Sequence, residues 1–165
     1  LGIELIQMSF DGFQQLYSYN PSLQFHLNLA PHQLLDPQLA EILLRELICH
    51  KLPAQHLTLE LTEHSILEPN ATVEANLATL RQAGVRLALD DFGTGYSSLV
   101  LLKQLHPDMV KIDKSFIQAI AEDKENLHII TLISSLAPKL GLELIAEGLE
   151  DRTSLTQLKI GRAHV

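Results

Sequence analysis

Five short apolar segments that each end in polar or acidic residues recur along this chain. They are QFHLNLA, LTLELTE, LALDDF, MVKID and LELIAEG. Their polar ends lie 23 to 34 residues apart, and each gap carries apolar residues at the spacing of an amphipathic helix. One strand and one helix in roughly every 30 residues is the rhythm of βαβ units, whose strands are parallel. The sequence therefore predicts an α/β fold with parallel strands.

The polar residues at the ends of these segments form a candidate site. They are Asn28, Glu60, Asp90, Asp91, Lys111, Asp113 and Glu147. If the parallel strands close into a barrel, all of these residues lie at the carboxyl ends of strands, where barrel enzymes build their active sites. Oxygen ligands suit hard divalent cations such as Mg²⁺ and Mn²⁺, and the chain lacks the Cys and His set of a structural zinc site. The pattern predicts a TIM-type barrel with a divalent-metal site.

Two adjacent carboxylates, Asp90 and Asp91, are followed closely by Gly93 and Gly95. The like charges repel each other unless a cation lies beside them, and the glycines allow a tight turn after the strand. A purely structural alternative is that Asp91 caps this turn while Asp90 is solvated. The other strand-end residues favour the metal site over this alternative.

Capping residues predict where several helices begin and end. Asp36 and Pro37 predict the start of one helix, and Asn70 predicts the start of another, which Gly84 closes in the left-handed conformation. A third apolar-faced helix is predicted over residues 126–140.

Several charged or reactive residues are given no functional role. Glu41, Glu46 and Glu74 are interpreted as solvent-facing residues of helices, and Cys49 as a small apolar residue in the packing. The histidines lack the i, i+4 or HxH spacing of a metal site, so none of them is expected to be a metal ligand. Seven of the eight are His26, His32, His50, His56, His64, His106 and His128, and the eighth, His164, lies in the segment 160–165.

Five ordered motifs in the chain resemble those of the EAL domain, the bacterial phosphodiesterase domain of cyclic di-GMP signalling. The resemblance runs from about Ser22 to about Gln157. Its motifs are NLA with Asn28, ELTE from Glu60, DDFGTGYSS from Asp90, KID from Lys111 and AEGLE from Ala146. The resemblance implies metal-dependent hydrolysis of cyclic di-GMP to linear 5′-pGpG, with a water molecule activated by two Mg²⁺ or Mn²⁺ ions as the nucleophile.

The resemblance also assigns metal-binding roles to individual residues. Asn28, Glu60 and Asp90 would bind one metal ion. Asp90, Asp91 and Glu147 would serve a second ion, so that Asp90 bridges the two. Such a pair of ions clamps the scissile phosphate between them.

Catalytic and supporting roles follow from the same resemblance. Lys111 would stabilise negative charge that develops during the attack, and Glu147 would act beside it. Asp113 would line the second-metal or substrate side of the site. The residues expected to support the substrate and the loop after the paired aspartates are Glu63, Gly93, Thr94 and Gly95.

The resemblance sets an expectation for the domain boundaries. Residues 1–159 would be a partial EAL domain that lacks the first strand, with its Glu-Ala-Leu motif, and the C-terminal βα units, because a closed barrel needs about 200 to 250 residues. We expect such a fragment to be inactive. Residues 160–165, IGRAHV, match the translation of common sequencing-adapter DNA and are interpreted as an artefactual tail.

Charge and composition exclude some classes of partner. With 12 basic and 20 acidic side chains the chain has a net charge of −8, which argues against a basic patch for nucleic-acid polymers and requires cations to attract a phosphate ligand. No signal peptide or long apolar run is present, so a cytoplasmic location is expected, although the parent protein could be membrane-anchored. The resemblance implies a homodimer and allows an upstream sensory or GGDEF-type domain.

A second hypothesis is a catalytically silent EAL-like domain that acts as a cyclic di-GMP receptor or protein-interaction module. Such domains differ from active ones in the metal set or in the loop after the paired aspartates. Here each metal-site position within the chain is filled and the loop DFGTG is whole, which favours an active parent domain.

Overall fold

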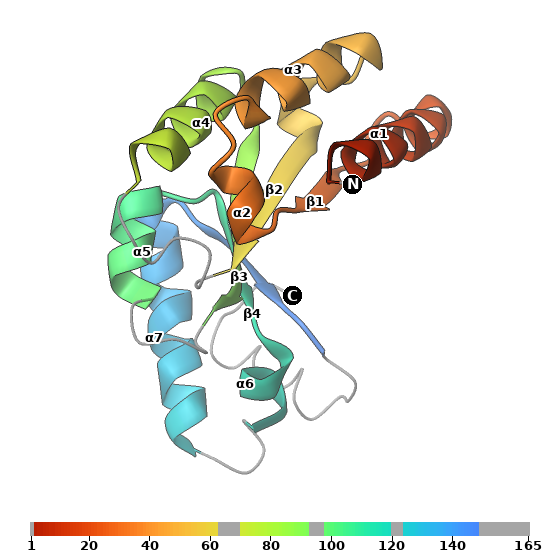
Figure 1. The fold of residues 1–165 in the computed structure, drawn as a ribbon. Coiled ribbons are helices and arrows are strands. Elements are labelled where there is room, and N and C mark those ends of the chain that lie inside the picture. Colours follow the sequence, from red (N-terminus) through yellow and green to blue (C-terminus); the bar gives the residue numbers. More distant parts are fainter. Residues whose placement is uncertain (1, 63–69, 93–97, 120–123, 149–165) are drawn as a thin grey trace. The chain divides into compact units, whose positions relative to one another are not determined.

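The structure, a computed structural model, describes residues 2–62, 70–92, 98–119 and 124–148. Its five strands form one sheet in the order β1-β2-β3-β4-β5 (Figure 1). The pairs β1–β2, β3–β4 and β4–β5 are parallel. The strands are β1 (Phe25–Asn28), β2 (Leu57–Thr62), β3 (Arg86–Phe92), β4 (Met109–Ile112) and β5 (Glu143–Ala146). The predicted α/β fold with parallel strands is therefore confirmed.

Of the described helices, one precedes β1, and the others lie between successive strands. They are α1 (Gly2–Tyr19), α2 (Pro31–Leu34), α3 (Leu39–Cys49), the 3₁₀ helix η1 (Ala54–His56), α4 (Ala71–Gln82), α5 (Ser98–Leu105), α6 (Lys114–Ala119) and α7 (Lys124–Leu140). None of the helices in the described part of the chain has both the length and the apolar character needed to cross a membrane.

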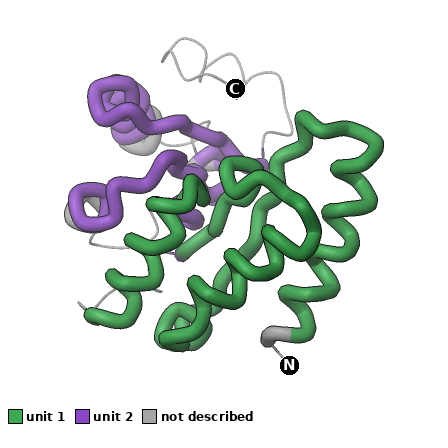
Figure 2. The backbone as a smooth tube through the Cα atoms, turned by 90° about the horizontal axis from the view of Figure 1, so that it is seen from above, with its two compact units in different colours: residues 1–61, 65–87 green, residues 62–64, 88–165 purple. Residues whose placement is uncertain are grey.

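The chain divides into two compact units, which are coloured separately in Figure 2. The first unit comprises residues 1–61 and 65–87. In its core, Leu57, Leu59 and Leu61 of β2 are almost completely buried. Because alternate residues of a strand share a face, these three leucines line one buried face of the sheet, and Thr58 and Glu60 are buried on the other.

The predicted caps of α4 are confirmed. The side chain of Asn70 accepts hydrogen bonds from the backbone N–H groups of Thr72, at 2.9 Å, and Val73, at 3.3 Å. Gly84 follows the helix with a φ of 95°, a conformation that side chains disfavour. By contrast, α3 begins at Leu39 rather than at Pro37, because the carboxylate of Asp36 caps a preceding turn by accepting the N–H of Gln38.

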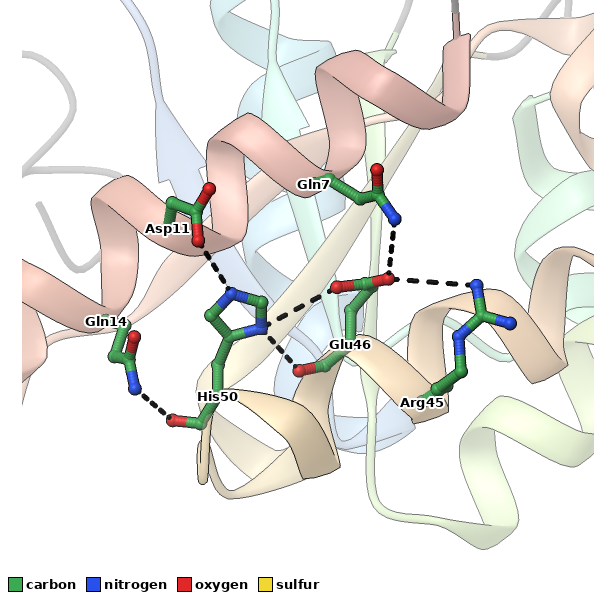
Figure 3. Close-up of polar contacts among 6 residues, drawn as sticks. All are labelled: Gln7, Asp11, Gln14, Arg45, Glu46 and His50. Carbon is green, nitrogen blue, oxygen red and sulfur yellow. Dashed lines mark hydrogen bonds and ion pairs between the residues drawn. The ribbon is translucent and has the colours of Figure 1, made fainter.

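Polar contacts hold α1 against α3 in the first unit (Figure 3). We call Gln7, Asp11, Gln14, Glu46 and His50 the α1–α3 clasp. His50 Nε2 lies 3.0 Å from Asp11 Oδ1, and His50 Nδ1 lies 2.8 Å from the backbone oxygen of Glu46. Gln7 donates to the Glu46 carboxylate and Gln14 to the backbone oxygen of His50, each at 3.2 Å.

Both ring nitrogens of His50 face oxygen acceptors, so the protonated imidazolium is the form that satisfies both contacts. The hydrogen bond to Asp11 is the largest cause that raises the pKa of His50 above its ordinary value, and the backbone oxygen of Glu46 is the next. The clasp therefore links the packing of α1 on α3 to the protonation of one histidine.

Two side chains of α3 differ from the expectations drawn from the sequence. Glu46 is only 6% exposed, whereas a solvent-facing position was expected. It lies four residues after Ile42 and three after Leu43, on the apolar face that α1 covers, and Gln7 satisfies its carboxylate. Cys49 is exposed and does not pack as a core residue.

The second unit comprises residues 62–64 and 88–165, and its described sheet places β4 between β3 and β5. Val110 and Ile112 of β4 are buried. The predicted helix over residues 126–140 is confirmed as α7, which starts slightly earlier, at Lys124. After α7 the backbone N–H of Leu142 donates to the oxygen of Ala137 at 2.9 Å, which turns the chain directly into β5.

Candidate metal and catalytic site

The structure describes seven of the residues that the sequence placed in the site. These are Asn28 and Glu60 in the first unit, and Asp90, Asp91, Lys111, Asp113 and Glu147 in the second unit. Glu63, Gly93, Thr94 and Gly95 lie outside the described residues.

In the second unit, the ammonium group of Lys111 bridges two carboxylates. Its Nζ lies 3.2 Å from Asp90 Oδ1 and 2.7 Å from Glu147 Oε1. We call these three residues the Lys111 cluster. The side chains of Lys111 and Asp90 are 12% and 14% exposed, and that of Glu147 is 36% exposed. Carboxylates at the ends of two separate strands thus form ion pairs with one ammonium group.

Strand register explains how Lys111 and Glu147 meet. Lys111 of β4 is paired with Ile145 of β5, so that Glu147, two residues further on, follows on the same face. The backbone N–H of Glu147 donates to the oxygen of Ile112 at 3.1 Å, which continues the strand pairing beyond β5. The main chain therefore fixes the point from which the Glu147 side chain reaches Lys111.

A register shift places both paired aspartates opposite Lys111. Leu89 is paired with Val110 and Phe92 with Ile112, so two residues of β3 face one residue of β4. Such a bulge bends the strand and redirects its side chains, and bulges are common beside active sites. The two aspartates therefore lie in a bulge within β3, and the turn predicted at Gly93 and Gly95 lies outside the described residues.

Asp91 has a strained backbone, with a φ of 54°. Its N–H donates to Asp90 Oδ1 at 3.0 Å, which holds one aspartate against the other. A residue other than glycine in this left-handed region costs on the order of 1–3 kcal/mol and is held there by its surroundings. Desolvation raises the pKa of Asp91 above its ordinary value, and the nearby charge of Asp90 raises it further. A cation beside Asp91 would relieve both effects.

Asp113 caps a helix in this structure. Its carboxylate accepts the backbone N–H of Ser115 at 2.8 Å and also the Ser115 hydroxyl, at the start of α6. The hydrogen bond from the Ser115 side chain lowers the pKa of Asp113 below its ordinary value. The expected role of Asp113 on the second-metal or substrate side stays a prediction.

In the first unit, Asn28 and Glu60 are register partners at the carboxyl ends of β1 and β2. The next backbone N–H, that of Leu29, donates to the oxygen of Glu60 at 3.1 Å. Partners in a parallel pair direct their side chains to the same face, so an amide oxygen and a carboxylate emerge side by side. Asn28 is exposed, whereas Glu60 is only 5% exposed.

His26 is a further member of this set that the sequence analysis missed. Its Nδ1 lies 2.8 Å from Glu60 Oε1. His26 is paired with Thr58, so it shares the face of the sheet that carries Asn28 and Glu60. The available signal was its position two residues before Asn28, but the histidines were assessed only for spacing along the chain and not across the strands.

The side chains present fit a hard divalent cation by their chemistry, because carboxylate and amide oxygens are the ligands that such ions prefer. The Lys111 ammonium places one positive charge beside the carboxylates of both Asp90 and Glu147. In the described part of the chain, no group of three or more His, Cys, Asp or Glu side chains is arranged to hold a metal ion. The expected cluster is thus observed as two partial sets, one in each unit.

Comparison with protein families gives a match over nearly the whole chain. Residues 5–161 match the family model described as the EAL domain. The bifunctional diguanylate cyclase/cyclic di-GMP phosphodiesterase MucR of Pseudomonas aeruginosa is 37% identical over 124 residues, which is 75% of this chain and 18% of MucR. The curated relatives are long proteins, and the chain spans 17% to 20% of those it matches.

Solved structures show the same fold. A MucR phosphodiesterase in complex with c-di-GMP has a TM-score of 0.87 at 30% identity, over 99% of this chain and 66% of that chain. The EAL domain of Mycobacterium smegmatis DcpA has a TM-score of 0.89 at 31% identity, over 98% of this chain and 73% of that chain. A manganese and c-di-GMP complex of Klebsiella pneumoniae BlrP1 has a TM-score of 0.86 at 27% identity, over 98% and 41% of the two chains.

Proposed function

Because the chain belongs to the EAL domain family, we propose that it serves the hydrolysis of cyclic di-GMP, opening one phosphodiester to give linear 5′-pGpG. The observation that carries this proposal is the Lys111 cluster, in which two strand-end carboxylates converge on one ammonium group. The MucR structure, a phosphodiesterase in complex with c-di-GMP, supports the choice of substrate.

Divalent cations are part of the proposal. Asn28, Glu60, Asp90, Asp91 and Glu147 would provide oxygen ligands for two Mg²⁺ or Mn²⁺ ions. When bound, such ions polarise a phosphodiester and make water a stronger nucleophile at neutral pH. The manganese complex of BlrP1 supports this choice of metal. A cation beside Asp91 would favour the ionised form of this carboxyl group, whose pKa is raised first by desolvation and then by Asp90.

Lys111 supplies a fixed positive charge to the reaction. Its side chain is 12% exposed, and two carboxylates restrict where the ammonium can go. A charge held in place before the reaction stabilises developing negative charge on a phosphate oxygen without reorganising. Because the chain carries a net charge of −8, this local positive charge also offsets the repulsion between the protein and an anionic substrate.

Three finer elements of the proposal concern residues and contacts beyond this cluster. Asp113 acts on the second-metal or substrate side in addition to capping α6. Glu63, Gly93, Thr94 and Gly95 support the loop after the paired aspartates. The domain forms a homodimer, which sedimentation of the protein with and without Mn²⁺ would detect.

The test is chromatography of cyclic di-GMP after incubation with the full-length protein and Mg²⁺ or Mn²⁺. We expect linear pGpG, and we expect Lys111→Ala to lower kcat by about 10²–10³-fold, the usual loss when a group that stabilises transition-state charge is removed. Lys103→Ala, at an exposed position of α5, is the matched control and should leave turnover unchanged.

The outcomes separate the enzyme from the receptor. Formation of pGpG that Lys111→Ala slows by this factor and Lys103→Ala leaves unchanged would support the phosphodiesterase. Tight binding of intact cyclic di-GMP without turnover would instead indicate a receptor domain. Neither binding nor turnover by the full-length protein with either metal would overturn both functions.

A further inference from the structure

The contact between His26 and Glu60 joins a residue without an assigned role to an expected metal ligand. His26 lies on β1, the strand that also carries Asn28, and its Nδ1 is 2.8 Å from Glu60 Oε1. The Glu60 side chain is 6% exposed, and that of His26 is 32% exposed. This contact thus joins a partly exposed imidazole to a buried carboxylate.

A carboxylate buried to this extent is stabilised by hydrogen-bond donors. An ionised carboxylate only accepts hydrogen bonds, so Nδ1 of His26 carries the proton in this contact. The neutral imidazole tautomer with a proton on Nδ1 is sufficient for this. The donated bond ties down Oε1 and so restricts rotation of the whole carboxylate group.

Strand geometry makes this contact specific to its position. His26 is paired with Thr58, and Asn28 with Glu60. The four side chains therefore lie on the same face of β1 and β2. Thr58 is fully buried, and its hydroxyl has no hydrogen-bond partner in the described part of the chain. The Thr58 hydroxyl, which belongs to the register partner of His26, therefore does not compete with Glu60 for a hydrogen bond to the imidazole.

We propose that His26 is a positioning residue for the metal site: it donates from Nδ1 to Glu60 Oε1 and orients the carboxylate toward the cation. This proposal rests on the proposed function, in which Glu60 is a metal ligand. Hydrogen-bond partners of ligating carboxylates set the orientation of the ligand, and their loss typically weakens metal affinity or activity by about 10–100-fold. His26 is assigned this positioning role rather than the role of a ligand because hard cations prefer oxygen donors.

The experiment is a titration of the full-length protein with Mn²⁺, with free Mn²⁺ followed by electron paramagnetic resonance and no substrate present. We expect His26→Phe, which keeps an aromatic ring but removes the donor, to weaken Mn²⁺ binding by about 10–100-fold. His26→Asn should recover most of the affinity, because its amide nitrogen can take the place of Nδ1 and donate to Glu60. His32→Phe, the same change at an exposed position of α2, is the control and should bind Mn²⁺ like the unchanged protein.

Comparison with Glu60→Gln separates failure of this proposal from failure of the proposed function. Mn²⁺ binding that depends on Glu60 but is unchanged in His26→Phe would overturn the role of His26 alone. No Mn²⁺ binding, or binding insensitive to Glu60→Gln, would overturn the metal site and the role of His26 with it. Electron spin-echo spectra of bound Mn²⁺ that show a coordinated nitrogen, lost in His26→Phe, would make His26 a ligand and would also overturn the positioning role.

Discussion

The α1–α3 clasp predicts that part of the stability of the protein depends on pH through His50. The perturbation is Asp11→Asn, which keeps an oxygen acceptor opposite His50 Nε2 but removes the negative charge. Asp11 is the largest cause of the raised pKa of His50. A histidine whose pKa is raised on folding stabilises the folded state below its ordinary value of 6.5, and this stabilisation is lost as the pH rises through the folded value.

The magnitude follows from the exposure of the two partners. A hydrogen bond to a charged group contributes about 1.5–3 kcal/mol when it is shielded from water. The His50 side chain is 13% exposed, but that of Asp11 is 69% exposed, so solvent screens the pair. We therefore expect Asp11→Asn to lower the free energy of unfolding by about 1 kcal/mol at acidic pH, which corresponds to a shift in Tm of about 2–4 °C.

The assay is thermal unfolding at about pH 5.5 and about pH 8.5, on either side of the titration range of a histidine. The difference between the protein and Asp11→Asn should be present at the lower pH and should shrink at the higher pH. Glu74→Gln, a change from acid to amide on the exposed surface of α4, is the control, and its effect should be the same at both pH values. An Asp11→Asn difference that stays constant, or grows as the pH rises, would refute the reasoning.

Three further predictions concern packing and caps. Gly148→Ala should destabilise the protein by at least about 1–2 kcal/mol in urea denaturation, because φ is 71° there and the new Cβ would lie 2.6 Å from Lys114 Cβ; an unchanged midpoint would contradict this. Asn76→Ala should lower the free energy of unfolding by about 1–3 kcal/mol, because Asn76 is only 4% exposed and donates to the backbone oxygens of Leu34 and Asp36. Asn20→Ala, at an exposed turn, is the control and should lower it much less. Asn70→Ala should lower the free energy of unfolding by about 1 kcal/mol in the same assay, because it removes the cap of α4. Asn70→Asp should leave it almost unchanged, since aspartate can also cap the helix. Equal losses in the two variants would argue against the cap.

Local sequence patterns were sufficient to predict the strands, both ends of α4 and the position of α7. The run LTLELTE predicted β2, and Asn70 and Gly84 predicted both ends of α4, because these signals depend on the chain within a few residues. The convergence of Lys111 and Glu147 could also be anticipated, since both follow parallel strands. The strands and the ends of α4 are determined by periodicity or by a cap, which the sequence shows directly.

Features that depend on register or on packing between elements could not be predicted in this way. The bulge at Asp90 and Asp91 follows from the pairing of β3 with β4, and nothing in the two residues alone reveals the positive φ of Asp91. The contact of His26 with Glu60 requires the register of β1 on β2. Glu46 is buried because α1 happens to cover its face of α3.

The central claim is that Lys111 acts on the bound phosphodiester through its fixed charge. The most direct measurement is the turnover of cyclic di-GMP by the full-length protein and by Lys111→Ala with Mn²⁺ present, together with the affinity of each for the substrate. The account predicts that kcat falls by about 10²–10³-fold while the affinity changes much less, because the ammonium serves charge that develops during the reaction. Turnover by Lys111→Ala equal to that of the unchanged protein would contradict the account.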